Sequence, residues 1–313
     1  MTGAAGFIGS HLCESLLDSG VEVRGVDRIS SYYDPDLKRA NLAPLLERDG
    51  FEFSEADLSR DPLEPALDGA EVVFHLAGQP GVRVSWGDEF QVYLDDNVLA
   101  TQRLLEAAKG RDLRRFVLAS SSSIYGDAES FPTTEAAKPA PVSPYGVTKL
   151  AAEHLCNLYA KGFDVPAVSL RYFTIFGPRQ RPDMAFTRFI RAALQGQAIE
   201  VFGDGLQERD FTFVGDAVAA TIAAGESGQP GTAYNIAGGN HATVVDVIGA
   251  LGELTGAALA VEHKPAVIGD ARKTGADTSR ASADLGYAPS TSLREGLALQ
   301  LEVERARLDL ASG

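Results

Sequence analysis

A tyrosine and a lysine four residues apart are the side chains of this sequence best suited to acid–base chemistry. Tyr145 and Lys149 lie in the segment SPYGVTK, at the start of an expected helix. One helical turn places two such side chains on the same face, where an ammonium favours the ionised form of a phenol. A tyrosine whose pKa falls from its usual value of about 10 can act as a base near neutral pH. The serine run Ser120 to Ser123 follows an expected strand, so a hydroxyl there could share the substrate proton.

Three glycines near the N-terminus have the spacing of a turn that binds phosphate groups. Gly3, Gly6 and Gly9 form GxxGxxG, and a helical run follows at once. Such glycines let the backbone approach a pyrophosphate, which then lies at the positive end of the helix. Asp27 ends the next expected strand, where its carboxylate would accept hydrogen bonds from the adenosine ribose and repel a 2′-phosphate. The pattern predicts NAD rather than NADP, although the neighbouring Arg28 could serve a 2′-phosphate or lie in solvent.

The elements that position these residues alternate between short apolar strands and helices. This alternation predicts an α/β fold with a parallel sheet that helices cover on both faces. The expected strands are 21–27, 51–53, 72–76, 116–120 and 167–172, and the expected helices include 11–19, 97–109 and 145–161. After Phe176, loops rich in glycine and proline mix with short helices. We expect an NAD-binding domain over residues 1–175, rejoined by 211–237, and a substrate domain over 176–210 and 238–313.

One strand of this arrangement is nearly absent from the sequence. The strand that leads into the glycine-rich turn is central in a doubly wound sheet, yet only Met1 and Thr2 precede Gly3. Its loss would leave backbone groups of both neighbouring strands unpaired, at about 1 to 3 kcal/mol for each buried group. We therefore expect the native chain to begin upstream of Met1.

Composition excludes several classes of protein. The 313 residues are 45% hydrophobic and 23% charged, which is typical of a globular chain with one or two domains. The apolar runs are far shorter than the roughly 20 residues of a bilayer span, so we expect a cytoplasmic protein with no membrane partner. A net charge of −15 disfavours nucleic acid as a partner. Cys13 and Cys156 are expected to be buried free thiols, and the histidines lack the spacing of metal ligands.

Six segments, taken in order, resemble the signature blocks of extended short-chain dehydrogenases/reductases that act on nucleotide sugars. They are TGAAGFIGSHL, HLAGQPGVR, SSSSIYG, SPYGVTK, RYFTIFGPR and GDGLQERDF, and they cover essentially the whole chain. The resemblance implies a Rossmann-type doubly wound parallel sheet with a smaller, discontinuous substrate-binding domain. It also implies NAD as cofactor, a UDP-sugar as substrate, and a homodimer packed through two long helices of each subunit.

The matching motifs also imply roles for individual residues. By this resemblance Tyr145 is the base, Lys149 is its partner and a ribose ligand, and Ser121 is the hydroxyl of the catalytic set. Arg209, in the ERDF block, would grip the diphosphate of the sugar nucleotide, which suits its bidentate fork. The residues implied for NAD binding are Gly3, Gly6, Phe7, Ile8, Gly9, Asp27, Asp57, Leu58, Ala77, Gly78, Asn97, Tyr145 and Lys149. The residues implied for substrate binding are Ser121, Ser122, Ser123, Thr174, Arg181, Arg209 and Asp270.

Two positions after the catalytic hydroxyl distinguish branches of this family. The 4,6-dehydratases place Asp and Glu where this chain has Ser122 and Ser123, and UDP-glucuronate decarboxylases carry a glutamate in place of Ser123. Segments 31–42 and 171–189 resemble those of UDP-glucuronate 4-epimerases, in which Ser122, Thr174 and Arg181 would face the sugar carboxylate. The expected reaction is therefore NAD-dependent epimerisation of UDP-glucuronate to UDP-galacturonate through a transient 4-keto sugar. A UDP-glucose 4-epimerase is the alternative, and a decarboxylase, a dehydratase and a non-catalytic NAD-binding regulator are further, disfavoured readings.

Overall fold

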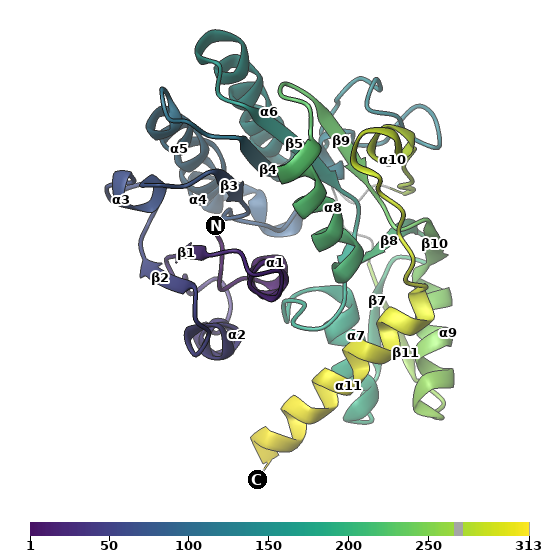
Figure 1. The fold of residues 1–313 in the computed structure, drawn as a ribbon. Coiled ribbons are helices and arrows are strands. Elements are labelled where there is room, and N and C mark those ends of the chain that lie inside the picture. The colour runs from purple at the N-terminus through teal and green to yellow at the C-terminus, as the bar shows by residue number, and fades with distance from the viewer. Residues whose placement is uncertain (266–271, 313) are drawn as a thin grey trace.

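A parallel sheet forms the centre of the chain in this computed structural model, which describes residues 1–265 and 272–312 (Figure 1). The strands run in the order β2, β1, β3, β4, β5, β9, with the N-terminal dipeptide between β1 and β3. They are β1 (Val23–Asp27), β2 (Phe51–Glu55), β3 (Val72–His75), β4 (Arg115–Ser121), β5 (Ala167–Tyr172) and β9 (Ala233–Ile236). All neighbouring strands pair in parallel, which confirms the Rossmann-type sheet expected from the sequence.

The N-terminal dipeptide occupies the place of the central strand. Thr2 forms single parallel bridges to Val26 of β1 and to His75 of β3. The amide of Thr2 donates to the carbonyl of Phe74 at 2.9 Å, and the amide of Val26 donates to the carbonyl of Met1 at 2.8 Å. These buried backbone groups are therefore paired, whereas the sequence led us to expect them without partners. The expectation was wrong for these groups because two residues suffice for one bridge on each side.

Helices cover both faces of the sheet, and their apolar stripes fill the space above and below it. On one face, α1 (Phe7–Asp18) and α8 (Val214–Ser227) share a core with β1, β4 and β5. On the other face, α5 (Ala100–Ala108) and α6 (Pro144–Phe163) pack on β3 and β4. The other helices of this half are α2 (Pro35–Leu46), α3 (Glu64–Leu67), α4 (Phe90–Tyr93), the π-helical η3 (Leu94–Leu99) and the 3-10 turns η1 (Arg83–Ser85), η2 (Gly87–Glu89) and η4 (Ser122–Ile124).

Two smaller sheets and four helices make up the rest of the residues that the structure describes. The sheets are β10-β8-β6 and β11-β7, and a separate apolar core joins them to α7, α9 and α11. The strands are β6 (Ile175–Phe176), β7 (Ile199–Phe202), β8 (Glu208–Phe213), β10 (Asn240–Thr243) and β11 (Val261–Lys264). The helices are α7 (Ala185–Leu194), α9 (Val244–Thr255), α10 (Ser279–Leu285) and α11 (Leu293–Ser312). Helix α10 packs on the core shared by α1 and α8, although it was expected in the substrate domain. The division into two domains stays a prediction.

The cysteines, the helix lengths and the possible metal ligands were also considered in the sequence. Cys13 and Cys156 are buried free thiols, as expected. Across residues 1–265 and 272–312, no helix combines the length and apolarity needed to cross a bilayer. The same residues contain no cluster of three or more histidine, cysteine or carboxylate side chains arranged to hold a metal ion.

Candidate active site

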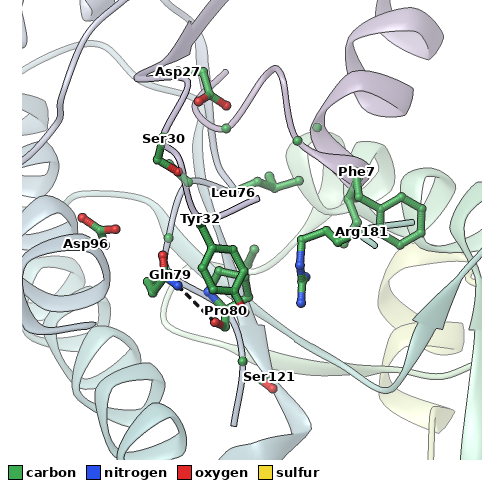
Figure 2. A pocket seen from close by; sticks show the side chains of 18 of the residues that line it. Phe7, Asp27, Ser30, Tyr32, Leu76, Gln79, Pro80, Asp96, Ser121 and Arg181 are labelled. Atoms are coloured by element: carbon green, nitrogen blue, oxygen red, sulfur yellow. Dashed lines mark hydrogen bonds between the residues drawn. The ribbon is translucent and has the colours of Figure 1, made fainter. Parts of the chain in front are cut away.

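A cavity of about 440 Å³ lies where the glycine-rich turn meets the carboxyl ends of β1, β3 and β4 (Figure 2). In open α/β sheets, ligands bind at this edge. The cavity collects most of the residues that the sequence singled out, although they come from widely separated segments. Those that line it are Gly3, Gly6, Phe7, Ile8, Gly9, Asp27, Asp57, Leu58, Ala77, Gly78, Ser121, Ser122, Ser123, Tyr145, Lys149, Thr174 and Arg181.

The glycine-rich turn brings an uncapped helix end to the cavity. Gly3 has φ of +75°, and a Cβ on it would lie 2.8 Å from the amide nitrogen of Ala77. A Cβ on Gly9 would lie 2.0 Å from the carbonyl oxygen of Gly3, so only glycine lets α1 pack this closely on the turn. Gly6 is the N-cap of α1, and no side chain caps the first amides of that helix. These amides and the helix dipole form a site suited to a phosphate group.

Asp27, the last residue of β1, lies beside the glycine-rich turn, and charged side chains are close to it. Its carboxylate accepts hydrogen bonds from two backbone amides, at 3.1 and 2.9 Å. Arg28 donates two hydrogen bonds to Asp96, at 2.8 and 2.6 Å, and a third to Asp57 at 3.3 Å. The side chain of Arg28 is 32% exposed, but its guanidinium is bound to two carboxylates and would have to leave them to bind a 2′-phosphate. This arrangement supports the preference for NAD that Asp27 indicated.

Lys149 is buried beneath the cavity, on the inner face of α6. Its Nζ donates a hydrogen bond to the carbonyl of Ala119 at 3.0 Å, and a Cβ on Gly78 would lie 3.3 Å from the same nitrogen. Burial lowers the pKa of Lys149 to about 8, and the nearby carboxylate of Glu153 opposes this effect. The side chain therefore carries a positive charge at neutral pH, next to the turn that contains Gly78.

Tyr145 lies in the first turn of α6, where the side chain of Ser143 caps the helix. Burial raises the pKa of Tyr145, whereas a hydrogen bond with Ser121 and the positive charge of Arg181 lower it. We expected the ammonium of Lys149 to be the cation that acts on the phenol. The pKa of Tyr145 is raised overall in this structure, so the expected fall of that pKa was wrong, and the role of Lys149 as partner of the phenol stays a prediction.

A buried ion pair, which the sequence analysis missed, supports the catalytic residues from behind. Glu153 lies one helical turn after Lys149 and is only 3% exposed. Nη2 of Arg171, from β5, donates to Glu153 at 2.9 Å, and the hydroxyl of Ser120 also donates to this carboxylate. Nη1 of Arg171 donates to the hydroxyl of Tyr125 at 2.7 Å. The signals in the sequence were a glutamate at helical spacing from Lys149 and an arginine inside an apolar strand.

Asn97, predicted to contact NAD, lies behind the cavity rather than in its lining. Its side-chain oxygen accepts from the amide of Gln79 at 2.8 Å, and its nitrogen donates to the carbonyl of Gln79 and to Thr148, both at 3.0 Å. Asn97 therefore ties the turn after β3 to helix α6. Its direct contact with NAD stays a prediction, and Asp270 lies outside the residues that the structure describes.

A second cavity of about 360 Å³ shares Tyr32 and Thr174 with the first and extends between β7 and α7. Arg209 lines this second cavity, and its Nη1 donates to the carbonyl of Glu208 at 2.9 Å. The guanidinium of Arg83 lies 4.4 Å from the ring centroid of Phe202 in the same wall. Arg209 was predicted from the sequence, whereas the pair of Arg83 and Phe202 was not, because its members are far apart in the chain.

Residues 1–237 match the family model described as the NAD dependent epimerase/dehydratase family. The chain belongs to this family. A crystal structure of UDP-glucuronic acid 4-epimerase from Bacillus cereus, in complex with UDP-glucuronic acid and NAD, is 43% identical, with a TM-score of 0.95 and 98% of both chains covered. Family membership and this likeness confirm the resemblance found in the sequence.

Two sequence relatives within the family carry different substrate names. A Bacillus subtilis (strain 168) protein described as an uncharacterized UDP-glucose epimerase, YtcB, is 44% identical, over 95% of this chain and 94% of that protein. The UDP-glucuronate 4-epimerase of Thermodesulfobacterium geofontis (strain OPF15) is 36% identical, over 99% of this chain and 97% of that protein. The choice between the two sugars therefore depends on the site itself.

Proposed function

We propose that this protein is an NAD-dependent UDP-glucuronate 4-epimerase that forms UDP-galacturonate. The observation that carries the proposal is the position of Arg181, whose guanidinium lines the same cavity as Tyr145. Ser122 and Thr174 line this cavity too and add two hydroxyl donors. A guanidinium and hydroxyl groups are the donors that a sugar carboxylate requires. We also propose a cytoplasmic location, because a reducing compartment suits the two buried free thiols.

The main cavity fits NAD. The uncapped amides of α1 would hold its pyrophosphate, Asp27 its adenosine ribose and Lys149 its nicotinamide ribose. The fit is supported by Gly78, where any side chain would meet the oxygen of Asn97 and the ammonium of Lys149. When bound, NAD supplies a hydride acceptor at sugar C4 and returns the hydride in the second half of the reaction.

The residues of this chain would handle protons and orientation. Tyr145 would take the proton of the C4 hydroxyl, with Ser121 sharing the hydrogen bond, and would return that proton when the hydroxyl forms again. Arg209, in the second cavity, would hold the diphosphate while the sugar turns over between the two half-reactions. Ser122 and Ser123 provide neither the acid nor the base that a dehydration needs, which disfavours a 4,6-dehydratase.

A UDP-glucose 4-epimerase is the second candidate function. It is supported by the name of the Bacillus subtilis relative, and by the carboxylate of Asp183, which already pairs with Arg181. A paired guanidinium leaves the pocket closer to neutral, so an uncharged hydroxymethyl group would meet less of a mismatch. The hydroxyls of Ser122 and Thr174 and the remaining edge of the guanidinium still favour the acidic sugar.

The proposal is tested by incubating the purified protein with NAD and UDP-glucuronate and following the sugar protons by NMR. We expect the signals of UDP-galacturonate to grow to equilibrium with no net formation of NADH, because the hydride returns in each cycle. UDP-glucose serves as the matched uncharged substrate. Formation of NADH in amounts equal to product would indicate a dehydrogenase. NMR signals of a pentose would indicate a decarboxylase, and equal turnover of both sugars would indicate a plain hexose epimerase.

We also propose that two copies associate through α5 and α6. The two helices contact each other, and large apolar side chains on α6 remain in solvent, with Val147 49% and Leu158 64% exposed. Residues eleven apart lie on the same side of an α-helix, so these two belong to one face. An exposed apolar helix face of this kind is typical of a subunit interface.

If the protein is a dimer, light scattering should give a mass of twice that of the chain. The variant Leu158→Asp should be a monomer, because a buried unpaired carboxylate opposes association. Leu46→Asp is the matched control, since Leu46 is 57% exposed on α2, away from these helices. It should leave the mass unchanged. A wild-type monomer at micromolar concentration would refute the proposed dimer.

A further inference from the structure

The guanidinium that would recognise the sugar carboxylate is already bound along one edge by a protein carboxylate. Nε of Arg181 donates to Oδ1 of Asp183, and Nη2 donates to Oδ2, both at 3.0 Å. The hydroxyl of Tyr32 donates to the same Oδ2 at 3.3 Å, and the guanidinium carbon lies 5.9 Å from the ring centroid of Tyr32. Figure 2 shows Arg181 beside Tyr32 in the pocket. The bonds to Asp183 use Nε and Nη2, and Tyr32 also contacts the guanidinium, so the Nη1 edge is the one turned away from Asp183 that a ligand can bind.

The backbone before Arg181 is fixed by the residues that precede it. Arg179, with φ of +63°, donates to Glu14 of α1 at 2.6 Å. Gln180 is buried, and its side-chain oxygen accepts from the amide of Thr187 at 3.1 Å. The position of the Arg181 Cα is therefore set without Asp183. What Asp183 determines is the direction of the long, flexible side chain of Arg181, because it holds two of its three nitrogens.

We propose that Asp183 is a positioning residue that sets the selectivity of this site for an acidic sugar. It holds the Nε and Nη2 edge of Arg181 and thereby directs Nη1 to the sugar carboxylate. One guanidinium has five N–H donors in a rigid plane, so it can bind two carboxylates on different edges. The inference rests on the proposed function, because it requires a substrate that carries a carboxylate.

Asp183 also explains how the pocket tolerates its cation before substrate binds. The side chain of Arg181 is 18% exposed, so an unpaired charge there would lose much of its hydration. Pairing with Asp183, which is 40% exposed, removes this cost while leaving the carboxylate partly in water. The acidic sugar then adds a second partner instead of replacing the first.

Loss of the Asp183 charge has two effects, and the ratio of two substrates separates them. A more positive pocket strengthens binding of every anion, including the diphosphate that both UDP-sugars carry. Loss of orientation weakens only the contact with the sugar carboxylate. The ratio of kcat/KM for UDP-glucuronate to kcat/KM for UDP-glucose therefore falls if Asp183 positions Arg181, and stays level or rises if Asp183 acts only through its charge.

The test is the variant Asp183→Asn in the full chain, assayed with both sugars. We expect the ratio to fall about tenfold, the effect of losing one well-aligned hydrogen bond to a charged group. The variant should also release more pentose from UDP-glucuronate, because the carboxylate is held less firmly. Asp183→Glu should recover most of the ratio. Asp18→Asn is the matched control: it breaks the pair of Asp18 with Arg48, outside both cavities, and should leave the ratio unchanged.

The outcomes distinguish this inference from the proposed function. If the wild-type protein prefers UDP-glucuronate and Asp183→Asn has the same ratio and the same pentose fraction, the role of Asp183 is refuted and the proposed function stands. If the wild-type protein prefers UDP-glucose, both are refuted. Should Asp183→Asn fail to fold, Tyr32→Phe removes one hydrogen bond to Asp183, and a smaller fall of the ratio is then expected. An unchanged ratio in Tyr32→Phe would count against the inference in that case.

Discussion

Tyr145→Phe is expected to lower kcat by about two to four orders of magnitude, the range that general acid–base groups contribute. The substitution removes one oxygen atom from a residue whose ring stays packed against Tyr93, with the ring centroids 6.2 Å apart. The fold and the affinity for the UDP-sugar should therefore be kept, so the loss falls on kcat rather than on KM. Steady-state kinetics with UDP-glucuronate measure it.

The matched control is Tyr159→Phe, which removes the same atom from the same helix. The hydroxyl of Tyr159 bonds Gln102 and Glu106, and this residue lines neither cavity. The kcat of the Tyr159→Phe variant should stay within about twofold of wild type, the usual result for a change outside the site. If Tyr145→Phe kept more than roughly a tenth of wild-type kcat, the assignment of this residue as the base would be wrong.

The pH dependence of kcat/KM tests the protonation state of Lys149. Burial lowers the pKa of Lys149 from 10.5 to about 8, so its ammonium is present below that pH and is lost above it. Loss of this charge removes the cation expected to hold the nicotinamide ribose. We therefore expect kcat/KM to decline as the pH rises above about 8. If kcat/KM kept rising as the pH approached the ordinary pKa of lysine, Lys149 would have to stay protonated in the working enzyme.

The parts of the site that could be predicted are those whose chemistry depends on local spacing. The glycine-rich turn needs only residues that follow one another, because the turn and the helix start are a single local structure. Asp27 could be found because a strand ends where its last residue meets the cavity. Tyr145 and Lys149 could be paired because helical periodicity fixes their common face.

The parts that could not be predicted depend on partners from distant segments. Arg171 and Glu153 are 18 residues apart, and nothing in their spacing shows that a strand and a helix bring them together in the core. The phenol of Tyr145 was expected to have a lowered pKa, but helical spacing does not show how deeply a residue is buried, and burial raises this pKa. The dipeptide at the N-terminus showed too little strand character to reveal its bridges to both neighbouring strands.

Control of the sugar carboxylate decides which product forms, because oxidation of C4 turns UDP-glucuronate into a β-keto acid. Such an acid loses CO2 when the bond to its carboxylate aligns with the π system of the new carbonyl. An epimerase must therefore hold the carboxylate out of this alignment until the hydride returns. Thr174 and Ser122 line the cavity on the side of the catalytic residues, and Arg181 reaches it from the loop before α7. Donors on more than one side can fix the plane of a carboxylate.

Arg181→Ala is expected to weaken binding of UDP-glucuronate by roughly 10- to 100-fold, the range for losing hydrogen bonds to a charged group. Thr174→Val, which keeps the shape and removes the hydroxyl, should act in the same direction with a smaller effect. Affinity for UDP-glucose should change little in either variant, because its hydroxymethyl group does not engage the fork of Arg181. Calorimetry with both UDP-sugars measures these affinities, and Arg48→Ala, which breaks a surface ion pair outside both cavities, is the control.

The same two variants should also lose control of the reaction course. With its carboxylate free to rotate, the keto sugar would release CO2, and the hydride taken from C4 would remain on the cofactor. NMR should then show pentose beside UDP-galacturonate, and absorbance should show NADH that accumulates in step with the pentose. If the variants bound both sugars as the wild type does and formed no pentose, the carboxylate site would have to be given up. The cavity would then be that of a hexose epimerase, in which Arg181 and Asp183 serve only to neutralise each other.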